Sequence, residues 1–390
     1  MAGTISVDVA PLDLLQQTLP QLLSNLSIAR AQIAIDQIRA TIDTRSLENL
    51  TFLGASPRDA TPSHPEAPDQ QSSHGTEFSA AAIVIQQPPS AELDKTSSNA
   101  CSASSDMATM IHAGFLEGIE SGNSKGLPDS IRQELISAVA VELDRRLRSQ
   151  GVDFVQWATD PKPMLDNSLE RWCLGLGFEA IGCLDYLSCE LQSDRSYAHG
   201  RESEATETND HSETDHPALC FEPVCWDSPT AMDLFADLVE RTYQATLDCP
   251  DLSRFRTPRQ TLQGYRSSSA FDPATWFHVK DHNNRDVGCL VMASHHDTQS
   301  PSPDPSNTVS ELVYMGLVPE ARGQGHGQRL VDYVMQRTRE QGRKRVILAV
   351  DQTNTPARSI YDQFGFRKML SETVWAKRLT SAKRETRSVA

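Results

Sequence analysis

Three glycines at alternate positions stand between a proline and an amphipathic run in PEARGQGHGQRL, residues 319–330. Glycine has no side chain to hold a ligand away from its backbone amide. The first amides of a helix lack backbone partners, and the helix dipole favours negative charge at that end. A strand, a glycine loop and a helix in this order are therefore suited to binding phosphate.

Two common phosphate loops do not fit this spacing. A P-loop requires Gly-Lys-Ser/Thr, whereas Gln328 and Arg329 follow Gly327. A dinucleotide fingerprint requires G-x-G-x-x-G, but these glycines repeat every second residue. Asp351 would suit a ribose contact, yet the chain ends at residue 390, too soon after the loop for a doubly wound domain. A nucleotide-binding oxidoreductase is disfavoured, and a purely structural turn remains an alternative.

A second segment, NTPARSIYDQFGF at residues 354–366, follows one helix and one strand later. The glycine loop matches R/Q-x-x-G-x-G/A, and the second segment matches N-x-x-A-x-x-x-Y-x-x-x-G-F. This pair of motifs resembles the two signatures of the GNAT acetyltransferase superfamily, and the resemblance extends from about residue 220 to 379. Members of that superfamily bind acetyl-CoA and pass its acetyl group to an amine.

The resemblance implies which residues hold the coenzyme. It assigns the pyrophosphate to the loop formed by Arg322, Gly323, Gln324, Gly325, His326, Gly327 and Gln328. It places the pantetheine arm beside Leu317 and Val318, just before Pro319 removes a backbone donor. Asn354 would orient the coenzyme or cap the backbone. The basic run at 343–345 reads as a solvated helix end that could also contact the 3′-phosphate.

The resemblance also implies catalytic roles. Tyr361 lies where the family keeps the tyrosine that protonates departing CoA, although its helical position also suits a core aromatic. Glu311 opens the central strand, where some branches place a glutamate that accepts the amine proton, and it could equally be a solvated carboxylate. We expect no metal, because His295, His296 and Asp297 end a strand beside a Ser/Pro loop.

Hydrophobic periodicity and turn residues predict an α/β fold with a mixed sheet and helices on its faces. The expected helices are 228–247, 325–341 and 355–364, with Gly342 ending the second and Thr355 capping the third. The expected strands are 275–281, 286–297, 310–319, 345–351 and 372–379. The intervening stretch 247–273 reads as a variable loop that lines the acceptor pocket; its Arg254, Arg256 and Arg259 could attract a carboxylate or be surface charge.

An internal repeat predicts two domains of similar design, unless the similarity is due to chance. QGVDFVQWATD (150–160) parallels QGRKRVILAVD (341–351), and each is followed by a helical stretch and a Gly-Phe pair. We expect a degenerate GNAT-like domain at 1–191 with long polar loops, an acidic disordered linker at 192–217, a catalytic domain at 218–380 and a tail at 381–390. In the first copy Cys173 replaces Tyr361 as a buried thiol and the glycine loop is missing, so we expect no acetyl-CoA turnover there. The arrangement resembles that of mycothiol synthase in architecture only.

Composition limits the partners. The chain carries 52 acidic against 36 basic residues, a formal net charge of -16, which disfavours nucleic acid and anionic membranes. Its eight cysteines form no C-x-x-C pair, and neither a signal peptide nor a membrane span is evident. We expect a reduced, soluble, cytoplasmic protein whose two GNAT-like domains pack together, with a homodimer compatible with the sequence.

These observations predict an N-acetyltransferase that moves an acetyl group from acetyl-CoA to a primary amine in a ternary complex. The acceptor stays open and could be a small molecule or a peptide. A module that binds or senses acetyl-CoA or CoA without catalysis is the alternative.

Overall fold

The computed structural model describes residues 5–24, 26–43, 49–57, 78–86, 107–116, 127–161, 167–191, 219–226, 228, 230–266, 271–296 and 308–379. The predicted linker at 192–217 and the tail at 381–390 lie outside these residues. The chain forms two compact units, and neither is a continuous stretch of sequence. Unit 1 comprises Met1–Cys183, Arg254–Arg256 and Glu372–Ala390, and unit 2 comprises Leu184–Ser253 and Thr257–Ser371. No helix in the described ranges is long and apolar enough to cross a membrane.

Unit 1 is a mixed sheet with helices on both faces. Its strands run in the order β1 (Ile5–Val9), β2 (Leu50–Pro57), β3 (Ala80–Gln86), β4 (Met107–Phe115), β5 (Phe154–Thr159) and the end of β12 (Arg367–Arg378). Only the β4–β5 pair is parallel; the other pairs are antiparallel. The helices are α1 (Leu12–Leu22), α2 (Ile28–Asp43), α3 (Asp129–Ser149) and α4 (Asn167–Gly175).

Alternate residues of the unit 1 strands feed two separate cores. Leu53 and Ala82 belong to the core that contains the buried side chains of α3 and α4. Their neighbours Phe52 and Ile83 belong to the core that contains those of α1 and α2. Since successive side chains of a strand point to opposite faces, α3 and α4 cover one face of this sheet, and α1 and α2 cover the other.

A buried histidine on β4 makes the stability of unit 1 depend on pH. Burial lowers the pKa of His112 to about 4, while its hydrogen bond to the Leu22 carbonyl and the charge of Asp160 oppose that shift. The folded state therefore keeps this imidazole neutral where the unfolded chain protonates it. The resulting stability is present above the unfolded pKa of about 6.5 and is lost as the pH falls toward the folded pKa.

We expect the wild type to lose about 3 kcal/mol of unfolding free energy relative to His112→Phe between pH 7 and pH 4. Phenylalanine keeps a ring at the edge of Trp157, whose centroid lies 6.2 Å from that of His112. Denaturant titrations of both proteins at several pH values measure this difference. Parallel loss of stability in the two proteins would show that His112 does not carry the effect.

Unit 2 has the same kind of sheet. Its strands run in the order β6 (Glu179–Glu190, from Leu184), β11 (Arg345–Asp351), β10 (Thr308–Leu317), β9 (Asp286–His296), β8 (Trp276–Lys280) and β7 (Cys220–Pro223). Only β10 and β11 pair in parallel. The helices are α5 (Ala231–Tyr243), α6 (Pro258–Arg266), α7 (His326–Glu340) and α8 (Thr355–Gln363). The predicted mixed sheet with flanking helices is confirmed.

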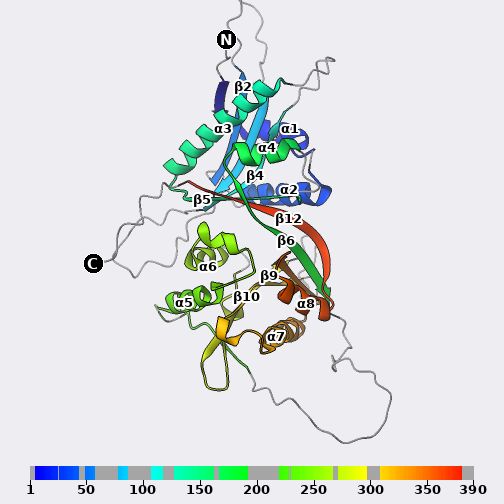
Figure 1. The fold of residues 1–390 in the computed structure, drawn as a ribbon. Helices are drawn as coiled ribbons and strands as arrows, with labels where there is room; N and C mark the ends of the chain where they lie inside the picture. The colour runs from blue at the N-terminus through cyan, green and yellow to red at the C-terminus, as the bar shows by residue number, and fades with distance from the viewer. Residues whose placement is uncertain are drawn as a thin grey trace, which may run out of the picture. The chain divides into compact units, whose positions relative to one another are not determined.

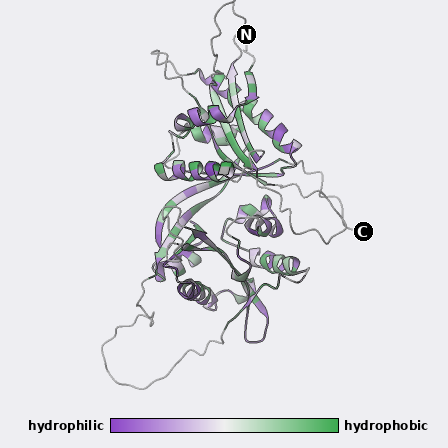
Figure 2. Cartoon of the chain, turned by 180° about the vertical axis from the view of Figure 1, so that it is seen from behind, coloured by the Kyte–Doolittle hydropathy of each residue, from purple (hydrophilic) through white to green (hydrophobic). Residues whose placement is uncertain are grey.

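The four helices of unit 2 form two pairs. The α5–α6 pair lies on one side of β9 and β10, and the α7–α8 pair lies on the other (Figure 1). Colouring by hydropathy shows apolar residues concentrated along the strands, while the helices carry both apolar and polar residues (Figure 2). Each helix therefore buries one face on the sheet and exposes the other.

Two expectations about helix ends have different outcomes. Gly342 follows α7 with φ 71°, and the Arg343 amide donates to the Thr338 carbonyl at 3.1 Å, which confirms the predicted left-handed end. Thr355 does not cap α8, because Asn354 takes that position and its Oδ1 accepts from the Ala357 amide at 3.4 Å.

The prediction that residues 247–273 form only a loop is wrong. It contains α6, whose nine residues bury only Thr261 and Leu262. The nine residues of α6 are mostly polar and include a glycine and a proline, a composition typical of loops, which is why the sequence favoured a loop here.

The predicted repeat is visible in the backbone of both units. β4 skips Ile111 in its pairing with β3, and β10 skips Val313 in its pairing with β9; each bulge lies three residues before a glycine, Gly114 or Gly316. The two units thus share a bulged strand that pairs in parallel with the next one.

The helix ends repeat as well. After α4 the Phe178 amide donates to the Cys173 carbonyl at 2.9 Å, and after α8 the Phe366 amide donates to the Tyr361 carbonyl at 3.0 Å. Cys173 therefore occupies in unit 1 the position of Tyr361 in unit 2, as predicted. Its side chain is fully buried, and burial raises the pKa of the thiol.

Candidate active site

The parallel strands β10 and β11 separate at their carboxyl ends. They pair only from Ser310↔Val346 to Leu312↔Leu348, although β10 continues to Leu317 and β11 to Asp351. The bulge at Val313 falls where the pairing stops. Beyond it, no strand among the described residues pairs with the facing edges of β10 and β11.

Backbone groups of β10 face this opening in alternation. The Val318 amide donates to the Val287 carbonyl at 3.0 Å, and Leu317 lies opposite Gly288 in the antiparallel ladder with β9. Because hydrogen-bonded and non-bonded pairs alternate in such a ladder, Leu317 and Met315 direct their backbone groups away from β9, toward β11. An extended ligand with amides of its own could pair there as an added strand.

The sequence predicted that Leu317 and Val318 contact the pantetheine arm, but only some of their backbone groups are free of hydrogen bonds to the described residues. The Val318 amide is already bound to Val287, and the Leu317 carbonyl accepts from Arg322 Nε at 3.1 Å. The Leu317 amide remains directed to the opening. Met315, which the sequence did not single out, shares that orientation because it lies two residues earlier on the same strand.

Glycine is required in this loop for two different physical reasons. Gly323 and Gly325 have φ 73° and 77°, and a side chain on either would meet no atom within 4 Å, so the left-handed backbone demands glycine there. Gly327 instead lies against α8, where a Cβ would come within 2.8 Å of Ile360 Cδ1. Gly325 is the N-cap of α7 and provides no side-chain cap. The amides at the start of α7 are thus left uncovered.

Side chains of the loop bind protein groups. Arg322 donates to three carbonyls, those of Leu317 at 3.1 Å, Ala245 at 3.1 Å and Thr242 at 2.8 Å. This guanidinium joins the end of α5 to the end of β10. The backbone of the loop, more than the Arg322 side chain, is therefore what the structure offers to a phosphate.

The other side chains of the loop are also bound to protein groups or buried. Gln324 Nε2 donates to the Glu320 carbonyl at 2.8 Å, and Gln328 Nε2 donates to Gln363 Oε1 at 2.8 Å. His326 is only 8% exposed at the first position of α7. The loop is held in place by these contacts, with its amides directed outward from the helix start.

Tyr361 lies on α8 in the core of unit 2. It is 6% exposed, and its ring centroid is 5.6 Å from that of Phe366. Burial, and after it the charge of Asp248, raises the pKa of the Tyr361 phenol above its ordinary value. The phenol therefore stays protonated at neutral pH, the state that a proton donor requires.

Asp248 is a candidate that no sequence motif indicated. It follows α5 and reaches the end of β11, where its Oδ1 accepts from the Asp351 amide at 3.0 Å. The residue after Asp248 also binds Asp351: the Cys249 amide donates to Asp351 Oδ2 at 3.2 Å. Burial raises the pKa of Asp248, and the neighbouring Asp351 charge adds to that rise. The charge of Asp248 in turn acts on both Tyr361 and Tyr314.

Unit 1 provides an internal comparison for Asp248. There the Ser27 amide donates to Asp160 Oδ2 at 2.9 Å, so Ser27 and Asp160 repeat the contact of Cys249 with Asp351. The residue before Ser27 is Leu26, where unit 2 has Asp248. This bond from a backbone amide to an aspartate is present in both units. The carboxyl of Asp248 occurs only in unit 2, the unit that has Tyr361. Aligning the repeats on these aspartates is the signal that could have found it.

Glu311 lies on β10 at the last paired positions before the opening. Its Oε2 contacts His295 Nε2 at 2.5 Å, and this bond raises the pKa of His295. Ser310 accepts from Arg343, which follows α7, so the alternation of the strand turns Glu311 toward the α5–α6 side. Glu311 is 29% exposed as a side chain and is therefore reachable.

The remaining motif residues have structural partners. Arg259 pairs with Asp233, Arg254 pairs with Glu179, and the Arg256 guanidinium lies 5.6 Å from the Phe154 ring centroid. Arg345, in the basic run, pairs with Glu190. The described ranges, which stop before Asp297, contain no cluster of three possible metal ligands.

The segment that holds this geometry matches a known family. Residues 239–366 match the acetyltransferase (GNAT) family. The second half of the chain carries a GNAT-family domain. The match includes the glycine loop, the opening between β10 and β11, and Tyr361.

Individual relatives match about a quarter of the chain. The mycothiol acetyltransferase of Geodermatophilus obscurus is 31% identical over 108 residues, 27% of this chain and 33% of the relative. The 5-NmdU N-acetyltransferase of Pseudomonas phage PaMx11 is 28% identical over 102 residues, 26% of this chain and 64% of the relative. The chain thus spans about a third of the length of the mycothiol acetyltransferase that it matches.

A solved tandem GNAT protein from the clavulanic acid biosynthesis pathway aligns with 97% of this chain and 100% of its own. Its identity is 11% and its TM-score 0.42.

Proposed function

We propose that the GNAT domain transfers an acetyl group from acetyl-CoA to a primary amine while both are bound. The observation that carries this proposal is the separation of β10 from β11 directly before a glycine-capped helix. The opening offers backbone to the pantetheine amides, and the start of α7 offers uncovered amides to the diphosphate. The names of the relatives, both acetyltransferases, agree with this reaction class.

The reaction forms a C–N bond to the acetyl carbonyl carbon and breaks the C–S bond of the thioester. The nitrogen must first lose a proton, and the departing sulfur must gain one. Tyr361 would protonate the sulfur, because burial keeps its phenol neutral at neutral pH. Binding the two substrates side by side supplies much of the rate by proximity.

Two carboxylates would handle the amine. We assign the proton-accepting role to Glu311, whose side chain is 29% exposed and whose Oε2 is held by His295 Nε2. We assign recognition of the ammonium form to Asp248, since one of its oxygens binds the Asp351 amide and the other accepts no hydrogen bond from the described residues. An amine acceptor also agrees with the formal charge of -16 on the chain, which favours cationic over anionic partners.

Asp248→Asn should raise KM for the amine by about tenfold or more, because it removes a charge-assisted bond. Asparagine keeps an oxygen that can accept from the Asp351 amide, so the hydrogen bond between residues 248 and 351 can be retained. The measurement uses thiol release from acetyl-CoA with the best substrate from a panel of primary amines. Because burial raises the pKa of Asp248, the low-pH fall of kcat/KM should lie above the ordinary range of an aspartate and should disappear in the variant.

Asp332→Asn, an exposed change on α7, serves as the matched control and should leave KM unchanged. An Asp248→Asn protein with wild-type KM and the same pH profile would remove Asp248 from the acceptor site. The acetyl-CoA affinity, measured in parallel, should stay constant in both variants.

A further inference from the structure

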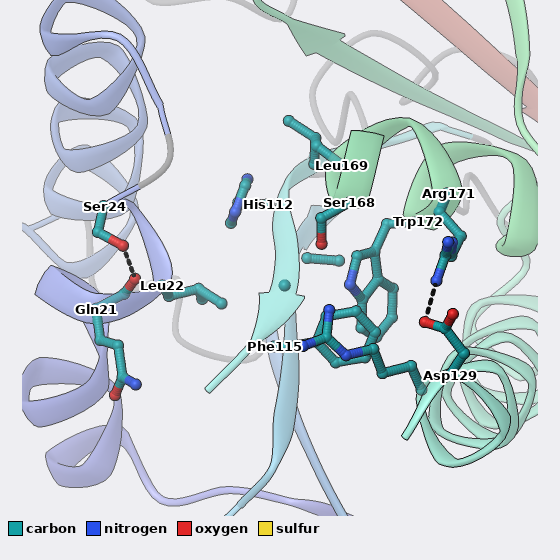
Figure 3. Close-up of a pocket in the computed structure, with 13 residues that line it drawn as sticks. Gln21, Leu22, Ser24, His112, Phe115, Asp129, Ser168, Leu169, Arg171 and Trp172 are labelled. Atoms are coloured by element: carbon teal, nitrogen blue, oxygen red, sulfur yellow. Dashed lines mark hydrogen bonds and ion pairs between the residues drawn. The ribbon is translucent and has the colours of Figure 1, made fainter. Parts of the chain in front are cut away.

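Unit 1 contains a cavity of about 400 Å³ that the proposed reaction does not use. The end of β4, the end of α1 and the starts of α3 and α4 enclose it, as the close-up shows (Figure 3). Its wall includes apolar rings and several groups that can form hydrogen bonds or carry charge: His112, Phe115, Asp129, Arg132, Arg171 and Trp172.

The cavity lies at the position in unit 1 that the proposed coenzyme site has in unit 2. β4 pairs with β5 only from Met107↔Phe154 to Met110↔Trp157 and then continues unpaired on that side to Phe115. The bulge at Ile111 marks the separation, as Val313 does in β10. Unit 1 thus keeps the opening between its two parallel strands.

Unit 1 lacks the features at the start of its helix α3 that would bind a diphosphate. The N-cap of α3 is Pro128, which has no amide hydrogen, and the first helical residue is Asp129. A carboxylate in the first turn repels an anion from the helix N-terminus. Pro128 thus stands where unit 2 has Gly325, and we expect a ligand smaller than a coenzyme.

Two buried ring nitrogens in the cavity wall lack hydrogen-bond partners among the described residues. They are His112 Nδ1 and Trp172 Nε1, and the two side chains are 3% and 0% exposed. His112 is neutral and donates its single ring N–H, on Nε2, to the Leu22 carbonyl, which leaves Nδ1 as an acceptor. The indole N–H of Trp172 can only donate. Since unpaired buried polar groups cost stability, a ligand with one donor and one acceptor would satisfy both.

The charged groups favour an anion. Arg132 donates through Nε to the Leu127 carbonyl at 3.0 Å, and its guanidinium carbon lies 5.2 Å from the Phe115 ring centroid. Arg171 pairs with Asp129 at 3.0 Å and is 45% exposed as a side chain. Among the residues that line the cavity, two guanidinium groups face one carboxylate, while Asp160, whose charge acts on His112, lies outside the lining.

We propose that this cavity binds a small carboxylate that carries an O–H or N–H group and an apolar body. Its carboxylate would accept from the Trp172 indole and Arg132. Its hydroxyl or amide would donate to His112 Nδ1, and its body would lie against Phe115 and Trp172. The site is separate from the proposed transferase centre, and its test does not depend on acetyl transfer.

Three closely matched probes test the proposal on the full chain. Mandelate has a phenyl ring, a hydroxyl and a carboxylate; phenylacetate lacks the hydroxyl, and mandelamide lacks the charge. Binding is followed by calorimetry and by the indole N–H signal of Trp172, which Trp172→Phe identifies. We expect mandelate to shift that signal saturably and to bind about tenfold more tightly than either comparison compound.

Arg132→Gln should weaken mandelate binding by about tenfold. Arg145→Gln changes an exposed arginine of the same helix that pairs with Glu142, and it should leave binding unaltered. Thermal unfolding of both variants checks that unit 1 remains folded. The proposal is overturned if mandelate leaves the Trp172 signal in place, if the three probes bind equally, or if CoA displaces mandelate.

Discussion

Tyr361→Phe should lower kcat by about 10²–10⁴-fold, the usual contribution of a general acid. The substitution removes only the phenolic oxygen from a side chain that is 6% exposed. Phenylalanine keeps the ring that packs near Phe366, with centroids 5.6 Å apart in the wild type. The loss should therefore come from the missing proton and not from a collapsed core.

The experiment separates catalysis from coenzyme binding. Turnover is followed by thiol release with the panel amine, and acetyl-CoA affinity is measured by calorimetry. Affinity should be unchanged, because the proposed diphosphate site lies at the start of α7. Tyr333→Phe is the matched control: Tyr333 also lies in unit 2, where its ring stacks on Phe221 with centroids 3.7 Å apart, and its loss should not alter kcat.

Different outcomes distinguish the possible functions of the domain. Normal turnover in Tyr361→Phe would exclude the phenol as the acid. A wild type that binds acetyl-CoA tightly but acetylates no amine of the panel would favour the sensing module. No acetyl-CoA binding at all would contradict the proposed function itself.

Gly325→Glu should abolish measurable acetyl-CoA binding. The substitution places a carboxylate at the N-cap of α7, where the diphosphate is expected, and it strains a backbone with φ 77°. Calorimetry should show a loss of at least about a hundredfold in affinity, since like charges replace a favourable helix-end contact.

Gly342→Glu is the control at the opposite end of the same helix. Gly342 has φ 71°, and a Cβ there also meets no atom within 4 Å, so the backbone strain is closely matched. Both variants should lose similar thermal stability, but only Gly325→Glu should lose the coenzyme. Equal retention of acetyl-CoA by the two variants would contradict the seat at α7.

Local chemistry made part of this protein predictable. The strand of 345–351 appears with the predicted bounds, and α7 differs from its predicted range by one residue at each end. These features depend on periodicity and on the left-handed turn at Gly342, which neighbouring residues decide. The two motifs that carry the GNAT resemblance are equally local. Their residue types and spacing are enough to assign Tyr361 and the glycine loop to one domain.

Contacts between distant residues decided the rest. Asp248 meets Asp351, 103 residues later, and Arg322 binds the carbonyls of Thr242 and Ala245. Sequence spacing cannot reveal such pairs, because they arise only when the sheet brings the ends of α5, β10 and β11 together. The same holds for Gly327, whose reason is the side chain of Ile360 on another helix.

The sequence by itself determined most helices and strands of the second half, the repeat and the position of the proposed coenzyme loop, because each follows from backbone preferences over a few residues. Only the tertiary structure decided the composition of the compact units, in which Glu372 and the residues after it join unit 1 while Leu184 and the rest of β6 join unit 2. Strand pairing depends on partners far along the chain, and so does the cavity of unit 1, where side chains from β4, α3 and α4 converge.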